Sequence, residues 1–509
     1  MAARGTLTRS VAIRALGLLA GYAFFVPLSA AFHQTDIGWG TRAFIVALTA
    51  LSIAVPAAGV LALSILMPMA LVLAPLTGWV LSTAQITEIC LLAVVSGCSL
   101  RLVAPGERAG RIGTLALAFG MTVVTSVLVE LHGLTVVAPQ RLVWTEVWHH
   151  LTIDYWRAPR EFPAIHDAVR WVAGLALAVW GERVCRASRD GGRQFVRVWI
   201  MGGTAGALLT AVQLGEELLR GGLPIAEAVW WVVQRARMSV LQPDLNAAGS
   251  YFGLFLIPAV IVGWRRRTYW MLCVSVPLLL LSCGLARSRA SIGAMMAVVC
   301  ARWVSAVRWP VAARLAIAAV VIPAGASLAF LVATSRTHAT LGDAAEVRIQ
   351  MTRVALRTAE THPMFGVGLG NYIRRSRRFI TPDMALLEAF APNGENAHNN
   401  YLQILAELGV PAALLFVAMV GVVGWSGWTT PASRRTPELE GMTLGLLAFL
   451  ASSVFGHPLL VPEVFGVFML ALGLAAGLGA EPARPDGIGK WLVPGIAAFY
   501  AISLVWRLA

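Results

Sequence analysis

The chain has 509 residues, of which 58% are hydrophobic and 13% are charged, and its formal net charge is +14 at pH 7. Soluble domains are roughly 45–50% apolar and about 25% charged, so this composition excludes an ordinary soluble fold and indicates that lipid surrounds much of the molecule. A basic excess in a membrane protein collects in short cytoplasmic loops, so no nucleic-acid partner is expected.

The first element in chain order is an apolar run over residues 10–31, which follows a basic N-terminal segment. We interpret this run as the first membrane helix. A cleaved signal peptide is the alternative, although the run has no convincing small-residue cleavage site and further apolar runs follow it. The next stretch, 43–86, has no charged residue and is too long for one helix. Its prolines divide it into two spans or a hairpin.

Runs of the length needed to cross a bilayer, about 17–25 residues, recur through the rest of the chain. They predict an all-α protein: a polytopic transmembrane helix bundle of about 12–15 spans with one large, partly helical loop. The expected spans are 10–31, 43–64, 66–84, 87–103, 112–131, 168–184, 196–214, 249–264, 268–285, 290–306, 311–333, 411–427, 440–457, 463–480 and 490–507.

Arginine-rich short connections predict the orientation of these spans. When the spans alternate, all of these connections fall on one face, which the positive-inside rule makes cytoplasmic. The opposite face receives the longer segments 132–167, 215–248 and 334–409. We therefore divide the chain into a helix bundle at 1–333, a large outer loop at 334–409 and C-terminal helices at 410–509. The arginine-rich connections are 101–111, 186–197, 265–267, 302–314 and 434–435.

The first two outer segments carry aromatic side chains. In 132–167 they mark either an interfacial belt or a surface on which sugars stack. The adjacent His149 and His150 have no third ligand at metal-site spacing, so a metal site is not expected there. Segment 215–248 fits an amphipathic helix lying on the membrane surface. The six cysteines form no C-x-x-C pair and fit small packing residues within the spans.

Three features of the later chain could carry chemistry. Arg287 and Arg289 flank a serine at the outer end of a span, where arginines either anchor the helix by snorkelling or serve a site. Arg348 lies early in the large outer loop, where an ordinary surface arginine is the alternative to a functional role. The excess of arginine in this loop suggests an anionic ligand such as phosphate; a solvated charged loop is the alternative. His398 lies just before the chain re-enters the membrane, among amide side chains that can orient its ring for proton transfer.

Two motifs in the large outer loop resemble the O-antigen ligase and polymerase superfamily. One is His-Pro-Met-Phe-Gly-Val-Gly-Leu-Gly-Asn-Tyr at 362–372, and the other is Ala-His-Asn-Asn-Tyr-Leu-Gln at 397–403, which leads into Glu-Leu-Gly. Short segments at 288–290 and 244–246 also match. The resemblance therefore covers residues 240–420, a little over a third of the chain.

This resemblance implies a GT-C-type glycosyltransferase that is metal-independent and inverting, with no cofactor and no nucleotide sugar. It implies transfer of a glycan from an undecaprenyl-diphosphate-linked donor to an acceptor sugar hydroxyl, on the periplasmic face of the bacterial inner membrane. The acceptor is lipid A–core in a ligase and a growing, carrier-linked glycan in a polymerase. We prefer the ligase, but the length of the chain and its many expected spans keep the polymerase or a divergent ligase open.

The resemblance also implies roles for individual residues. His398 matches the essential loop histidine and is the expected catalytic base, while Arg289, Arg348 and Arg287 are expected to bind the diphosphate. The polyprenyl tail and the surrounding membrane lipid are further expected partners. A transporter is an alternative, but few charges lie within the spans and no inverted repeat is evident. The supporting residues are Asn246, Asn399, Glu395, Gly368 and Gly370.

Overall fold

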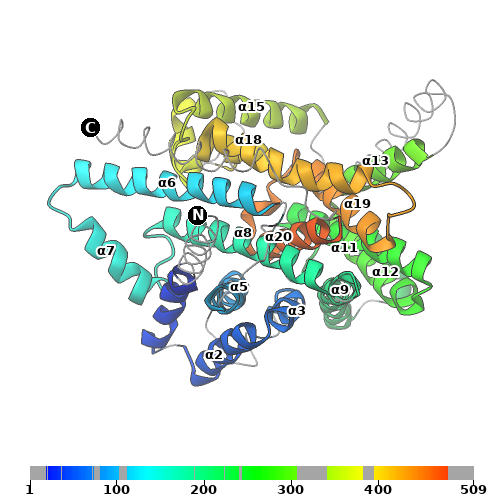
Figure 1. Ribbon diagram of the computed structural model, residues 1–509. Helices are drawn as coiled ribbons and strands as arrows, with labels where there is room; N and C mark the ends of the chain where they lie inside the picture. The colour runs from blue at the N-terminus through cyan, green and yellow to red at the C-terminus, as the bar shows by residue number, and fades with distance from the viewer. Residues whose placement is uncertain are drawn as a thin grey trace.

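The computed structural model confirms an all-helical chain (Figure 1). No strand occurs in the part that it describes. The described residues are 19, 21–35, 37–70, 73, 81–101, 110, 112–188, 190–222, 224–234, 236–239, 244–306, 341–381 and 395–479.

The described helices fall into two groups along the chain. The first group is α2 (Trp39–Ala54), α3 (Pro56–Leu66), α5 (Thr83–Leu100), α6 (Gly113–Val137), α7 (Val143–His149), α8 (Pro163–Ala187) and α9 (Arg193–Gly221). The second group is α10 (Ile225–Gln234), α11 (Leu245–Arg266), α12 (Val276–Ala286), α13 (Arg289–Ala306), α15 (Leu341–Thr361), α16 (Tyr372–Ser376), α18 (Asn400–Thr429), α19 (Pro437–Ser452) and α20 (Pro462–Leu478). Short π or 3-10 turns are η1 (His150–Asp154), η2 (Met271–Ser275), η3 (Arg377–Phe379) and η5 (Pro458–Leu460).

Five of the described helices, α5, α6, α9, α11 and α18, are long and apolar enough to cross a membrane. Shorter apolar helices lie at α2, α3, Met271–Ala286 and α20. Large apolar side chains such as Leu414 and Trp425 of α18 are 65% and 72% exposed, as expected of surfaces that face lipid. The chain is thus an integral membrane protein. Several of the 12–15 expected spans lie partly or wholly outside the described residues, among them 311–333 and 490–507.

Helices α6 and α9 run further at their C-terminal ends than their apolar sequence suggested. Helix α9 continues beyond the expected end at 214 to Gly221, and Gly222 then takes a left-handed φ of 57°. Helix α6 likewise continues past 131 to Val137. Hydropathy marks where apolar residues stop, whereas a helix stops where its backbone changes conformation. Both extensions fall in segments expected on the outer face.

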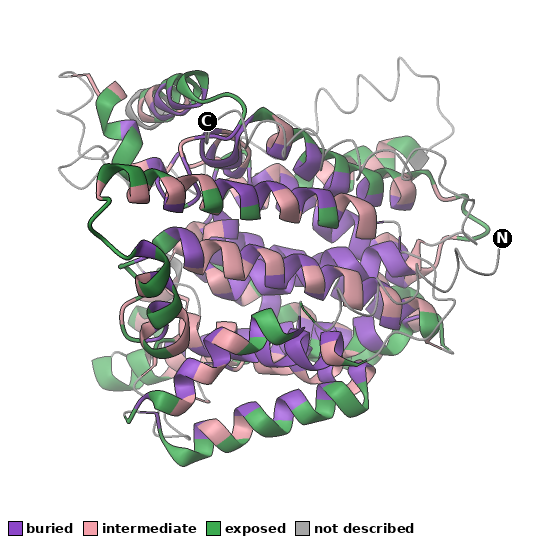
Figure 2. Cartoon of the chain, turned by 60° about the vertical axis from the view of Figure 1, so that its left-hand side comes forward, coloured by how far each residue is buried: buried purple, intermediate pink, exposed green. Residues whose placement is uncertain are grey.

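The centre of the bundle is packed through small residues. Helix α20 lies along α8 (Figure 1). A Cβ at Gly473 would lie 2.2 Å from the carbonyl oxygen of Ala178, and one at Gly174 would lie 2.4 Å from the ring of Phe465. Such close backbone approach is how membrane helices gain packing energy without a hydrophobic drive. Figure 2 accordingly shows buried residues concentrated in the inner helices and exposed residues on the outermost ones.

One end of the packed helices α11, α13, α18 and α19 collects arginine–glutamate pairs. Arg265 and Arg266 close α11, and Glu438 and Glu440 open α19. The nitrogen–oxygen distance is 2.6 Å for Arg265 with Glu440 and 2.9 Å for Arg266 with Glu438. Arg302 of α13 also lies 3.1 Å from Glu440. The sequence predicts that the connections 265–267 and 302–314 share a face. Arg265, Arg266 and Arg302 of these connections do lie together, beside the start of α19.

The opposite end of the same four helices carries the residues singled out for chemistry. Helices α11, α13 and α18 begin there, at Leu245, Arg289 and Asn400. Helix α19 ends there at Ser452, whose hydroxyl shares a hydrogen bond with that of Ser250 near the start of α11. One end of these four helices therefore holds the arginine–glutamate pairs, and the other end holds the expected site residues.

Candidate functional site

The turn that carries His398 is fixed by the start of α18. The side-chain oxygen of Asn399 caps this helix and accepts hydrogen bonds from the backbone N–H groups of Tyr401 (2.9 Å) and Leu402 (3.1 Å). His398 itself has a φ of 47°, a left-handed conformation that is uncommon for residues other than glycine. Asn399, expected as a supporting residue, thus acts on the backbone beside the histidine.

A second histidine, His457, faces the ring of His398. The two ring centroids are 4.6 Å apart and the planes are inclined by 75°. His457 precedes η5, in the connection between α19 and α20. The backbone N–H of Asn400 donates to the carbonyls of Ser453 (3.0 Å) and Gly456 (3.1 Å), which ties this connection to the start of α18. The two histidines are therefore held together by backbone hydrogen bonds.

Each histidine has a carboxylate neighbour. Glu395 Oε1 lies 3.7 Å from His398 Nε2, and Asp244 Oδ2 lies 3.4 Å from His457 Nε2. Asp244 is also the N-cap of α11, where its other oxygen accepts from the backbone N–H of Asn246 at 2.8 Å. Asn246, another expected supporting residue, thus lies at the start of the helix beside the histidine pair.

The surroundings keep both imidazoles neutral near pH 7. Burial lowers the pKa of His398 to about 4, with further lowering from the charges of His457 and Arg348 and partial opposition from Glu395. Burial also lowers the pKa of His457, against the opposing charge of Asp244. A neutral imidazole has a free lone pair, so the pair can accept a proton from a bound hydroxyl group.

Arg348 lies beside these histidines. It is on α15, and its guanidinium donates a hydrogen bond to the carbonyl of Phe455, two residues before His457. Its positive charge contributes to the lowered pKa of both histidines. The structure therefore brings together His398 and Arg348, which are 50 residues apart in the chain.

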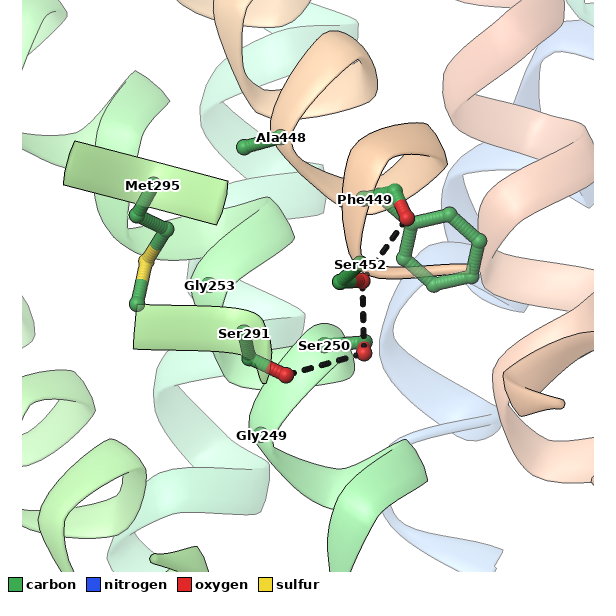
Figure 3. Close-up of a pocket in the computed structure, with 8 residues that line it drawn as sticks. All are labelled: Gly249, Ser250, Gly253, Ser291, Met295, Ala448, Phe449 and Ser452. Carbon is green, nitrogen blue, oxygen red and sulfur yellow. Dashed lines mark hydrogen bonds between the residues drawn. The ribbon is translucent and has the colours of Figure 1, made fainter. Parts of the chain in front are cut away.

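Arg289 begins α13 at the same end of the bundle. The hydroxyl of Ser291, in the first turn of α13, lies 3.0 Å from that of Ser250, which lies 2.8 Å from that of Ser452 (Figure 3). This chain of hydroxyls joins α13 to α11 and α19. The pocket that these serines line has no room for a water molecule, so it serves helix packing rather than substrate binding.

Arg287 contacts α10, and Gly368 and Gly370 lie in the turn before α16. The Arg287 guanidinium donates to the carbonyl of Val232 in α10 at 3.2 Å. Gly368 and Gly370 have left-handed φ values of 99° and 72° and lie against α6 and α8. A Cβ at Gly370 would lie 2.7 Å from Asp167 Oδ2. These glycines, two of the expected supporting residues, therefore shape the turn that packs against the bundle.

His457 and Asp244 are the site residues that sequence reasoning missed. Asp244 belongs to the short segment 244–246 that matches the superfamily, and His457 lies in none of the matching motifs. A usable signal existed for His457, because it ends the apolar run 440–457, on the face where the alternation of spans places the outer loops. Within the described part of the chain, no three histidine, cysteine, aspartate or glutamate side chains gather as a metal ion would require.

Fold and site together define a polytopic membrane protein with a histidine–arginine site at one end of its helix bundle. Residues 274–417 match the family model described as O-antigen ligase. The matched segment contains Arg289, Arg348 and His398, whereas Asp244 and His457 lie outside it. The resemblance found from the motifs is thereby confirmed, and it supports a glycosyltransferase-like role in the transfer of membrane glycans. No curated protein and no solved structure matches the chain.

Proposed function

We propose that the chain transfers a glycan from an undecaprenyl-diphosphate carrier to an acceptor sugar hydroxyl, with His398 as the general base. The observation that carries this proposal is the neutral His398–His457 pair beside Arg348, with His398 and Arg348 inside the segment that matches the O-antigen ligase family. We assign the site to the periplasmic face of the inner membrane because the arginine–glutamate cluster lies at the opposite end of the same helices.

In this proposal Arg289 and Arg348 hold the diphosphate, which leaves with two or more negative charges. Guanidinium groups can bind phosphate oxygens in pairs and neutralise charge as the glycosidic C–O bond breaks. Divalent cations fill this role in nucleotide-sugar enzymes, so two arginines support a metal-independent reaction. Arg287 contributes to the positive field while holding α10 through Val232.

His398 takes the proton of the acceptor hydroxyl as its oxygen attacks the anomeric carbon. Attack opposite to the leaving diphosphate inverts that centre. Burial lowers the pKa of His398, but a bound diphosphate brings negative charge close to the ring and raises the pKa again. The histidine then becomes a stronger base once the donor is in place. Glu395 stabilises the imidazolium that forms, since its carboxylate lies 3.7 Å from Nε2.

A ligase reaction, with lipid A–core as acceptor, is our preferred form of this function, and a polymerase reaction is the alternative. The experiment uses purified protein in lipid nanodiscs, a synthetic undecaprenyl-diphosphate-linked glycan as donor, and either lipid A–core or a carrier-linked repeat unit as acceptor. Product on lipid A–core supports the ligase, and elongation of the carrier-linked glycan identifies a polymerase. Absence of transfer to both acceptors contradicts the proposed function.

A further inference from the structure

A buried pair on α18 connects the glycine-rich turn to the histidine turn. Gln403 and Glu407 are spaced by four residues, so their side chains lie on one face of the helix. They are 3% and 5% exposed. Resting on the function proposed above, we propose that Gln403 and Glu407 are positioning residues that hold the backbone of the His398 turn in its active conformation.

The first link runs from Gln403 to the residue before His398. The side-chain oxygen of Gln403 accepts a hydrogen bond from the backbone N–H of Ala397 at 3.0 Å. Ala397 is itself 3% exposed, so water does not replace this partner if it is lost. The amide of Gln403 therefore fixes the peptide unit directly before the left-handed His398.

The second link runs from Gln403 to Glu407. The side-chain nitrogen of Gln403 donates to Glu407 Oε1 at 2.9 Å. This bond determines which way the amide of Gln403 points, because it assigns the nitrogen to Glu407 and leaves the oxygen for Ala397. Glu407 thus orients the group that holds the histidine turn.

Glu407 is in turn held by the glycine-rich turn. Its Oε1 accepts from the backbone N–H of Tyr372 at 3.3 Å, and its carbonyl accepts from the N–H of Gly368 at 3.1 Å. The carbonyl is available because Pro411, four residues further on, has no N–H to donate, and because Gly409 breaks the helix with φ 84° and ψ 177°. The two motifs of the outer loop therefore meet at one residue, and the break in α18 makes that meeting possible.

The arrangement matters because the left-handed φ of His398 is unfavourable for a residue with a Cβ. Asn399 holds the backbone after the histidine and Gln403 holds the peptide before it. Loss of the hydrogen bonds made by Asn399 or by Gln403 lets the turn relax and moves the ring of His398 away from His457. A displacement of about 1 Å at a reacting group can reduce the rate about 10²-fold.

The test compares Gln403→Met with the exchanged pair Gln403→Glu/Glu407→Gln. Methionine fills similar volume but offers no strong acceptor to Ala397. In the exchanged pair, the new carboxylate at position 403 accepts from the N–H of Ala397, and the new amide at position 407 donates to that carboxylate. We expect kcat to fall about 10²-fold in Gln403→Met with little change in KM for the donor, and to return to within about 3-fold of wild type in the exchanged pair.

A second readout does not depend on transfer activity. The rate at which diethyl pyrocarbonate modifies His398, followed by mass spectrometry, should rise severalfold in Gln403→Met and return to the wild-type rate in the exchanged pair. The matched control is Gln350→Met on α15, because Gln350 donates to Glu346 in an exposed pair with the same spacing. This control should leave both kcat and the reactivity of His398 unchanged.

The results separate this inference from the proposed function. If His398→Ala is inactive while Gln403→Met keeps wild-type kcat and wild-type His398 reactivity, the positioning role is wrong and the proposed base stands. If His398→Ala is fully active, the proposed base is wrong, and the reactivity of His398 still decides the positioning role. Should Gln403→Met fail to fold, Gln403→Glu alone takes its place, because it sets two carboxyl groups against each other. A lower kcat and altered His398 reactivity that the exchanged pair reverses support the inference, and wild-type values in Gln403→Glu overturn it.

Discussion

At the scale of single residues, the pKa of His398 is determined by burial and by its charged neighbours. A lone histidine in a loop has an ordinary pKa near neutrality. Here burial, His457 and Arg348 lower the pKa of His398 to about 4, while Glu395 opposes them. The neutral form, which the proposed base requires, therefore persists well below pH 7 in the unliganded protein.

Substitution of His457 and substitution of Glu395 should shift the pH dependence of kcat/KM in opposite directions. Protonation removes the base, so activity falls on the acid side as pH drops through the pKa of His398 in the free enzyme. His457→Ala removes part of the burial and a ring that can itself become positively charged at acidic pH, which raises this pKa and moves the acid limb to higher pH. Glu395→Gln removes a carboxylate that raises the pKa, and moves the limb to lower pH. Shifts of the same sign in both variants would contradict the assignment.

The diphosphate-binding role proposed for Arg289 requires the planar geometry of its guanidinium group as well as its charge. Lysine keeps the charge but loses the planar fork that binds two oxygens. We expect Arg289→Lys to lower kcat/KM for the lipid-linked donor about 10²-fold at normal protein level, a loss typical of a missing donor to a charged transition state. Full activity in Arg289→Ala would instead identify this arginine as an interfacial anchor.

At the scale of elements, the break in α18 organises the site. The helix runs from Asn400 to Thr429, and its backbone departs from helical geometry at Gly409, which has φ 84° and ψ 177°. Before this residue, the carbonyls of Ala406 and Glu407 accept from the glycine-rich turn. After it, the N–H of Val410 donates to the carbonyl of Pro363 at 2.7 Å. The first turns of α18 are therefore hydrogen-bonded to the loop as well as packed within the helix bundle.

Gly409→Ala should damage this element selectively. Only glycine adopts this backbone conformation readily, and a Cβ there would lie 2.6 Å from the carbonyl carbon of Met364. We expect a loss of about 1–3 kcal/mol in unfolding free energy, measured by thermal or denaturant unfolding in nanodiscs. The matched control is Gly421→Ala on the same helix, where a Cβ meets nothing within 4 Å. Equal stability of the two variants would show that the break is not required.

Sequence reasoning predicted the elements better than it predicted their contacts. Apolar runs and the large loop are evident from hydropathy, the motif at 397–403 points to His398, and the arginine excess of the loop points to Arg348. The pairing of His398 with His457 was not predictable, because 58 residues and two helices separate them and no local pattern encodes their approach. The sequence predicts a supporting role for Gly368 and Gly370 but not their position, and the fold places them against α6 and α8.

At the scale of the whole molecule, the proposed orientation rests on two ends of the same four helices. One end holds the pairs of Arg265 and Arg266 with Glu440 and Glu438, and the other holds the histidine site. Positive charge is retained on the cytoplasmic side during insertion. We therefore expect the histidine site to face the periplasm, where the proposed donor would be used.

This orientation is testable with single cysteines in a background that lacks Cys273 and Cys300, the two native cysteines that are not buried. Glu360→Cys on α15 should react with a membrane-impermeant thiol reagent in intact spheroplasts. Ser433→Cys, in the exposed connection before α19, should react only after the membrane is opened. The reverse pattern would place the histidine site in the cytoplasm.

The most direct measurement of the proposed base is the transfer rate of purified His398→Ala with an undecaprenyl-diphosphate-linked donor, compared with His362→Ala. Loss of a positioned base typically lowers the rate about 10²–10⁴-fold. We expect a decrease of about this size in His398→Ala, with donor binding and thermal stability close to wild type. His362 lies on an exposed turn in the same loop, so His362→Ala should remain within about 3-fold of wild type. A wild-type rate in His398→Ala would contradict the central role of this histidine.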